Sequence, residues 1–423
     1  MHVLSNVENL FLDYTPLDIS FLQSIGVLTS LKTLSLSYCH LTDLPTHQGL
    51  CYLNNLEELN VNGNALSGAI PSCLGNLTSL RYLDISNNRF TGNIASSPLT
   101  NLTMLQFISL SKNQFQLPVS FNSFANHSDL EVLLADENKL AANQLVYIYG
   151  GQNFNLRSLA CSINNTRLEK LILKDSSIVG SLSLSPHPNS KLSYLFMSQN
   201  ALTANIPLCL GGLRRLGMLD LSHNNLFGEI PEELGMSLSL FYLRLSNNSL
   251  SGKIFPKLYH FFNSLEALYL DGNKLEGKII EFSPISIKHL EELDVSDNHF
   301  YGKLPRWLWN NTELVILDFS KNHFEGPIPM GLCNLVNLEF LDLSLNHLSG
   351  TIPSCSNLQK VLHVHLAKNK LGGTLSDALF INSSLVTLDL SENNLTGRIP
   401  DWISTLPALR VFLLKANQFE GEF

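Results

Sequence analysis

Two pairs of cysteines share one spacing and could form disulfide bonds. Cys51 and Cys73 are separated by the same number of residues as Cys333 and Cys355, and the second member of each pair follows Ile-Pro-Ser. If successive segments of the chain stack, these positions lie close together. The spacing therefore predicts two disulfides and an oxidising compartment, with buried free thiols as the alternative. Cα separations well above about 7 Å would exclude both bonds.

Asn-x-Ser/Thr sequons offer a second kind of chemistry, N-linked glycosylation. They occur at Asn76, Asn101, Asn126, Asn164, Asn247, Asn310, Asn382 and Asn394. An Asn-rich chain generates sequons by chance, but all except Asn247 and Asn394 lie three or four residues before the start of a repeated segment. This placement predicts exposed sites on a protein that passes through a secretory pathway.

Carboxylates and imidazoles also recur at one position of the repeated segment. The carboxylates are Asp294, Asp318, Asp342 and Asp389. His365 occupies the same position in an intervening segment, and His363 precedes it by two residues. Such groups could bind a metal, sense pH or act as paired acids. However, Leu-Asp-Leu-Ser is the common sequence at this position of the repeat. An open surface also has no pocket that would raise the pKa of one of these carboxyl groups. We therefore expect no metal site, no cofactor and no enzyme.

The elements that position these residues come from one repeat, L-x-x-L-x-L-x-x-N-x-L, often followed by x-G-x-I-P. Seventeen copies begin at Val7, Leu31, Leu56, Leu80, Leu105, Leu130, Leu168, Leu192, Leu216, Leu240, Leu265, Leu290, Leu314, Leu338, Val361, Leu385 and Leu409. The alternating leucines predict a short strand whose leucines point inward. Stacked copies then form an α/β repeat solenoid with one parallel sheet along its concave side.

A column of asparagines is expected at the ninth position of the repeat, where the chain bends inward. Its members are Asn64, Asn88, Asn113, Asn138, Asn200, Asn224, Asn248, Asn273, Asn298, Asn322, Asn346, Asn369, Asn393 and Asn417, with Thr15, Cys39 and Ser176 as substitutes. An Asn side chain there can satisfy backbone groups that the bend would otherwise leave unpaired.

One interval breaks the period. The step from Leu130 to Leu168 is 38 residues, whereas every other step is 23 to 25 residues. Residues 156–161 resemble the start of a strand, but too few residues follow to complete a coil. We interpret residues 141–167 as a coil that lacks its middle, and we predict a protruding loop or a break in the sheet. The remaining residues, 1–140 and 168–423, are regular, so residues 1–423 are expected to form a single solenoid.

Composition excludes several partners. The net charge of the 423-residue chain is −9, and no run of Lys or Arg could follow a nucleic-acid backbone. No apolar stretch of about 18 residues is present to span a membrane. The first residues lack the features of a signal peptide. Any membrane attachment is therefore expected to depend on segments outside this chain.

The Gly-x-Ile-Pro extension carries a family resemblance. With Gly68-Ile70-Pro71, Gly326-Ile328-Pro329 and Gly397-Ile399-Pro400, the chain resembles the extracellular leucine-rich-repeat region of plant receptor-like proteins and receptor-like kinases over essentially its whole length. The resemblance implies a right-handed superhelix with a second, short sheet. It also implies a secreted, glycosylated ectodomain at the plasma membrane or in the apoplast. Such an ectodomain binds a peptide, glycan or protein ligand and signals with a partner receptor kinase in defence or development. The chain departs from the family pattern in lacking a signal peptide, both caps, a transmembrane helix and a kinase.

Outward strand positions predict where a ligand binds. Between Leu192 and Leu270 they carry Tyr194, Phe196, Met218, Tyr242, Arg244 and Tyr269. Aromatic residues around an arginine are typical of binding hot spots, although ordinary variation of surface residues explains them as well. Two other functions stay open. One is a soluble inhibitor of a secreted enzyme, similar to polygalacturonase inhibitors, and the other is an intracellular scaffold, which free thiols and unmodified sequons would favour.

Overall fold

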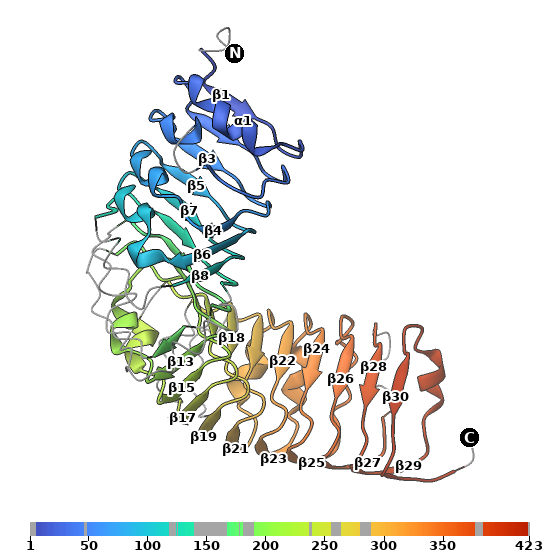
Figure 1. Ribbon diagram of the computed structural model, residues 1–423. Helices are drawn as coiled ribbons and strands as arrows, with labels where there is room; N and C mark the ends of the chain where they lie inside the picture. Colours follow the sequence, from blue (N-terminus) through green and yellow to red (C-terminus); the bar gives the residue numbers. More distant parts are fainter. Residues whose placement is uncertain are drawn as a thin grey trace. The chain divides into compact units, whose positions relative to one another are not determined.

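Short strands lie side by side along a solenoid in the computed structural model (Figure 1). The structure describes residues 6–45, 49–117, 124, 126–138, 167–176, 178–180, 190–236, 239–254, 264–279, 289–376 and 384–421. The chain divides into two compact units, unit 1 (Met1–Asn225) and unit 2 (Leu226–Phe423), which are described separately. The prediction of one regular solenoid from end to end stays a prediction.

The principal sheet of each unit contains one three-residue strand per repeat, paired in parallel with the next. In unit 1 these are β1 (Asn9–Phe11), β2 (Thr33–Ser35), β3 (Glu58–Asn60), β5 (Tyr82–Asp84), β7 (Phe107–Ser109), β9 (Val132–Leu134), β10 (Lys170–Ile172), β12 (Tyr194–Phe196) and β14 (Met218–Asp220). In unit 2 they are β16 (Tyr242–Arg244), β18 (Ala267–Tyr269), β20 (Glu292–Asp294), β22 (Ile316–Asp318), β24 (Phe340–Asp342), β26 (His363–His365), β28 (Thr387–Asp389) and β30 (Val411–Leu413).

A second set of short strands precedes the Ile-Pro segments, as the resemblance implied. Unit 1 has β4 (Ser67–Ala69), β6 (Arg89–Asn93), β8 (Gln114–Gln116), β11 (Val179–Gly180) and β13 (Ala201–Ala204). In unit 2 the set comprises β15 (Asn225–Gly228), which begins at the boundary, β17 (Ser249–Lys253), β19 (Lys274–Lys278), β21 (His299–Gly302), β23 (His323–Pro327), β25 (His347–Gly350), β27 (Lys370–Gly373), β29 (Asn394–Gly397) and β31 (Gln418–Phe419).

The other side of the coils carries short helical turns. One α-helix, α1 (Ile19–Ser24), is capped by the Asp18 side chain, which accepts the Ser20 N–H. α1 continues into a 3₁₀ turn, η2 (Ile25–Val27), and the described residues of other repeats contain further 3₁₀ turns: η3 (Gly49–Tyr52), η4 (Ser72–Asn76), η5 (Ile94–Ser96), η6 (Pro98–Asn101), η8 (Leu208–Gly212), η9 (Glu232–Met236), η11 (Arg306–Asn310), η12 (Met330–Asn334) and η13 (Asp401–Thr405). Several follow the proline of Ile-Pro, whose fixed φ suits the start of such a turn.

The repeat leucines form the core, as their spacing predicts. Leu34, Leu219 and Leu341, each in the middle of a strand, are 0% exposed. Leu10 and Phe412, at the same position in the end coils, are only half-buried because a coil covers them on one side alone. The apolar interior is therefore continuous along each unit and thins at its outer end.

The asparagine column is confirmed in the described coils. The Oδ1 of Asn298 accepts the Leu275 N–H at 2.9 Å, and its Nδ2 donates to Leu270 O at 2.9 Å. Cys39 substitutes as predicted, because its Sγ donates to Leu12 O at 3.0 Å. The Ser176 hydroxyl likewise donates to Ala135 O at 2.9 Å. These side chains satisfy backbone groups of the preceding coil.

The sheet does not break at the irregular interval, so that alternative is wrong. Strands β9 and β10 pair directly, with Val132 opposite Lys170 and Leu134 opposite Ile172. The two chain segments meet because each carries the same inward leucine pattern, which stacks whatever the length of chain between them. The predicted protruding loop and the strand start at residues 156–161 lie outside the described residues.

Candidate functional site

The principal strands display two outward rows of side chains. In β12, Tyr194 and Phe196 are partly exposed while Leu195 between them is buried. The middle residue is likewise buried in every other principal strand except the outermost ones, β1 and β30. Because neighbours pair without a shift, the first residues of successive strands form one row and the third residues form another. We call these outward rows the strand face of each unit.

The strand face of unit 1 carries an apolar band that crosses the six principal strands from β5 to β14. Its members are Tyr82, Phe107, Val132, Leu134, Ile172, Tyr194, Phe196 and Met218, all partly exposed. The rings of Tyr82 and Phe107 stack with centroids 4.4 Å apart. Burial on this face raises the pKa of the Tyr82 hydroxyl above its usual value. An apolar band left partly open on a sheet is typical of an interaction surface.

The band's residues lie on β5, β7, β9, β10, β12 and β14. Its continuity depends on the pairing of β9 with β10, which places Leu134 opposite Ile172 across the irregular interval. Ile172 in turn lies opposite Phe196. Without that pairing, the apolar residues before and after the interval would form two separate patches.

The predicted residues of unit 1 lie at the end of this band. The rings of Tyr194 and Phe196 meet edge to face with centroids 6.5 Å apart, and Met218 lies opposite Tyr194 on the next strand. The ammonium of Lys170 lies 4.9 Å from the centre of the Tyr194 ring, within cation–π range. The structure therefore brings Tyr194, Phe196 and Met218 together.

The other three predicted residues belong to unit 2. Arg244 lies opposite Tyr269, with its guanidinium 5.3 Å from the ring centre. The rings of Tyr242 and Tyr269 are 5.8 Å apart. These three residues contact one another within their own unit, while a single cluster of all six stays a prediction.

Five members of the apolar band were missed by the sequence reasoning. They are Tyr82, Phe107, Val132, Leu134 and Ile172. The available signal was their position, since each occupies the same outward place in its repeat as Tyr194 or Phe196. A search for aromatic residues around an arginine favoured the middle of the chain and overlooked the aliphatic residues before it.

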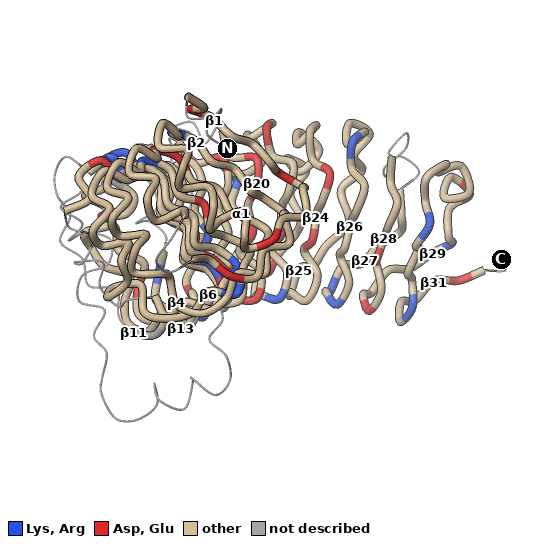
Figure 2. Tube along the Cα trace, turned by 45° about the horizontal axis from the view of Figure 1, so that its top comes forward, with Lys and Arg blue, Asp and Glu red and all other residues tan. Residues whose placement is uncertain are grey.

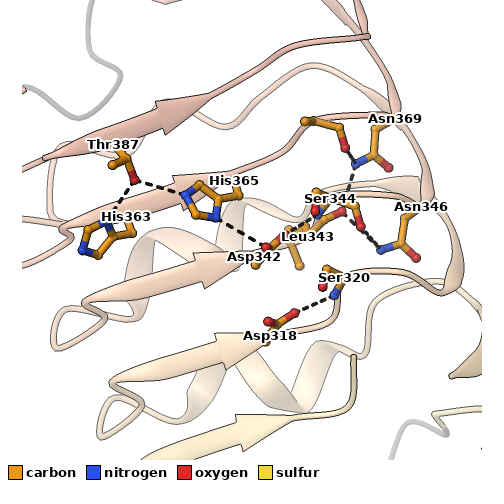
Figure 3. Close-up of polar contacts among 11 residues, drawn as sticks. Asp318, Ser320, Asp342, Leu343, Ser344, Asn346, His363, His365, Asn369 and Thr387 are labelled. Carbon is orange, nitrogen blue, oxygen red and sulfur yellow. Dashed lines mark hydrogen bonds and ion pairs between the residues drawn. The ribbon is translucent and has the colours of Figure 1, made fainter. Parts of the chain in front are cut away.

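The strand face of unit 2 is acidic. Asp294, Asp318 and Asp342 lie on successive strands, and His365 follows them in the same row. Figure 3 shows Asp318, Asp342 and His365. Burial and the charges of Asp294 and Asp342 raise the pKa of Asp318 to about 7. The expectation that no carboxylate here has a raised pKa is therefore wrong, because flanking side chains bury Asp318 without any pocket.

His365 connects this row to its neighbour. Its Nδ1 lies 3.4 Å from an Asp342 carboxylate oxygen, which raises the pKa of the imidazole. Its Nε2 lies 3.1 Å from the Thr387 hydroxyl, which also lies 2.9 Å from Nδ1 of His363 (Figure 3). Among the described residues, no group of three or more His, Cys, Asp or Glu side chains is arranged to hold a metal ion.

The cysteine pairs and most of the sequons lie away from the strand faces. The structure joins Cys51 to Cys73 and Cys333 to Cys355, with Cα separations of 5.4 and 4.9 Å. The described sequon asparagines are all exposed: Asn76, Asn101, Asn126, Asn247, Asn310 and Asn394. Asn164 and Asn382 lie outside the described residues.

Family models match several parts of the chain. A leucine-rich-repeat model matches residues 29–90, and a second one matches residues 215–236, 239–261, 289–311, 313–335, 337–358 and 384–406. Among curated proteins, Cuscuta receptor 1 of Solanum lycopersicum is 46% identical over 77 residues, which are 18% of this chain and 7% of that protein. Receptor-like protein 1 of Arabidopsis thaliana is 52% identical over 54 residues, 12% of this chain and 5% of that protein.

Solved structures match almost the whole chain. The Arabidopsis receptor kinase HAESA, solved with the peptide hormone IDA and the co-receptor SERK1, has a TM-score of 0.75 and 30% identity over 99% of this chain and 70% of that chain. The TDR receptor has a TM-score of 0.77 and 25% identity, covering 99% of this chain and 72% of its own.

Proposed function

This chain belongs to the leucine-rich-repeat proteins, in the form found in plant receptor ectodomains, and from that premise we propose that it is the ligand-recognition region of a plant cell-surface receptor-like protein. In this proposal the strand faces bind the ligand, and a partner receptor kinase transmits the signal. The chain itself catalyses no reaction.

The apolar band of unit 1 is the observation that carries the proposal. A monomeric protein rarely leaves aromatic and branched residues in a contiguous, partly exposed band unless a partner covers them. The stacked rings of Tyr82 and Phe107 are rigid, so binding them costs little side-chain entropy. The edge-to-face pair Tyr194 and Phe196 supplies a second anchor on the same face.

A peptide ligand and a co-receptor kinase are favoured by the HAESA complex, which contains a peptide hormone and SERK1. A glycan or a protein ligand remains within the proposal. The extracellular location is supported by the two disulfides and by the exposed sequon asparagines. Among the described helices, none has the length and apolar character needed to cross a bilayer.

The test measures how strand-face substitutions affect ligand binding. Interferometry measures the affinity of the purified chain for each member of a panel of synthetic plant peptides that includes IDA. We expect at least one peptide to bind, and the double substitution Tyr82→Ala/Phe107→Ala to weaken it at least about tenfold, since buried aromatic anchors dominate interfaces. Two further double variants show which part of the strand faces contacts the peptide: Tyr194→Ala/Phe196→Ala and Tyr242→Ala/Tyr269→Ala.

The matched control is Val336→Ala, an apolar side chain that is 42% exposed and lies outside the principal strands. Unchanged affinity in all three double variants would contradict recognition through the strand faces. If no peptide binds and the chain instead inhibits a polygalacturonase, the result would support the alternative function as a soluble enzyme inhibitor. Free thiols and unmodified sequons in native protein would support the intracellular scaffold.

A further inference from the structure

The second sheet of unit 2 carries an exposed row of basic and imidazole side chains. Each member is the first residue of its strand and directly follows an asparagine of the column. The row reads Lys274, His299, His323, His347 and Lys370, all exposed. The next residue of each strand is buried, so the core holds the strand in place and the first side chain points to solvent.

The three imidazoles of this row are stacked. The rings of His299 and His323 are 6.1 Å apart and inclined by 6°, and those of His323 and His347 are 5.9 Å apart and inclined by 18°. Rings stacked in this way cover one another's faces and leave their edges outward. Since the edges carry the ring nitrogens, the stack presents hydrogen-bonding groups at a regular pitch.

A second row runs parallel to the first at the far end of the strands. It consists of Lys253, Lys278 and Lys303, all exposed. A Cβ on Gly277 would lie 3.1 Å from Cγ of Lys253, and a Cβ on Gly302 would lie 3.2 Å from Cγ of Lys278. The lysine stems therefore extend across glycines of the next strand, where no side chain obstructs them.

We call these two rows the basic face of unit 2. Its five lysines form no ion pair with a described residue. Glu276 and Glu325 lie between the rows, and Glu229 precedes Lys253 in the second row, where its side chain lies against Gly252. Five lysines therefore face three glutamates on this side, although the chain as a whole carries −9. In Figure 2, blue segments (Lys, Arg) lie along the edge of unit 2 near the labels β25, β27 and β29, with red segments (Asp, Glu) among them.

We propose that the basic face of unit 2 is a second binding site, separate from the strand faces, for an acidic polysaccharide that carries a carboxylate on successive sugars. The carboxylates of such a polysaccharide recur at regular intervals along a stiff chain. The lysines and imidazole edges of the basic face also recur regularly, from one strand to the next, so the two are complementary. A stiff polymer also loses less conformational freedom on binding than an acidic peptide does. The proposal does not rest on recognition through the strand faces.

The probe is an oligomer of galacturonic acid, and its fully methyl-esterified form is the uncharged control. We expect the acidic oligomer to bind. Its affinity should fall as the salt concentration rises, because the contacts are exposed charge pairs. The esterified oligomer should not bind. Lys274→Gln/Lys278→Gln/Lys303→Gln should weaken binding about tenfold, since each exposed pair contributes modestly.

A matched control removes the same charge elsewhere through Lys32→Gln/Lys112→Gln/Lys174→Gln, three exposed lysines of unit 1. This variant should bind within about twofold of the wild type because its lysines lie outside the basic face. Thermal melting verifies that both variants fold. Asn394 neighbours the row, so all proteins are first stripped of N-linked glycans.

Three results would overturn the proposal. In the first, the wild type fails to bind the acidic oligomer even at low salt. In the second, the control variant loses as much affinity for the acidic oligomer as the basic-face variant does, which would mean that binding depends on the total charge of the protein and not on the basic face. In the third, polyglutamate competes as well as the acidic oligomer of equal charge, which would exclude selection of a polysaccharide. Peptide binding to the strand faces is measured separately, so the two proposals fail independently.

Discussion

Asp318 illustrates how neighbours determine the behaviour of a single side chain. Its carboxylate accepts the Ser320 N–H at 2.9 Å, which favours the charged form. Burial and the charges of Asp294 and Asp342 favour the neutral form more strongly, so the pKa of Asp318 rises to about 7. Because the unfolded chain has an ordinary Asp, the folded protein holds the extra proton between about pH 4 and pH 7.

The sign of the pH dependence follows from this. The folded state binds more protons than the unfolded state in that window, so the contribution of Asp318 to stability falls as pH rises toward 7. We expect Asp318→Asn to stabilise the protein at pH 8 by roughly 2 kcal/mol and to have little effect near pH 3.5. Thermal melting at both values checks this. Asp297→Asn, on an exposed carboxylate in a 3.9 Å ion pair with Lys321, is the control; an equal gain there would refute the explanation.

At the scale of elements, each coil is stabilised by the coils on either side. Interior strands have both neighbours, so Leu390 is 0% exposed. Leu414 occupies the same position in the next coil, but it is only half-buried because no described coil follows it. Stability in such a stack is close to a sum of coil and neighbour contributions, so position along the stack determines what a leucine contributes.

Two matched truncations measure this difference. Leu390→Ala should destabilise unit 2 by about 3 kcal/mol, since it removes a buried side chain and leaves a cavity. Leu414→Ala should cost about 1 kcal/mol, because part of that side chain is already in water. Urea unfolding followed by circular dichroism compares the two variants. Equal shifts in the unfolding midpoint would contradict the dependence on neighbouring coils.

At the scale of the whole molecule, the surfaces have different chemistry. Unit 1 has an apolar strand face, unit 2 has an acidic strand face, and the second sheet of unit 2 has a basic face. The disulfides and the exposed Asn76, Asn101 and Asn310 lie outside the strand faces. Glycans at these asparagines would therefore leave the strand faces open to a ligand.

Native protein from plant tissue tests the compartment. We expect deglycosylation to lower its mass, and Asn76→Gln/Asn101→Gln to remove part of that change. Cys51, Cys73, Cys333 and Cys355 should react with a thiol reagent only after reduction, because disulfides persist in oxidising compartments. An unmodified mass together with four reactive thiols would instead indicate the intracellular scaffold.

The structure of a single coil is predictable from the sequence alone. Alternating leucines, the asparagine after them and the Gly-x-Ile-Pro segment act within one repeat, and their meaning depends only on the local period. They predicted the buried Leu219, the hydrogen bonds of Asn298 and the outward side chains Tyr194 and Phe196.

Which strands pair across the irregular interval, and the surroundings of each side chain, depend on contacts between coils and could not be predicted from one repeat. The pairing of β9 with β10, which makes the apolar band continuous, joins strands across the irregular interval. The raised pKa of Asp318 and the stacking of His299 on His323 likewise arise between coils. Burial, charge coupling and ring stacking depend on separations across the stack, and the local period does not contain them.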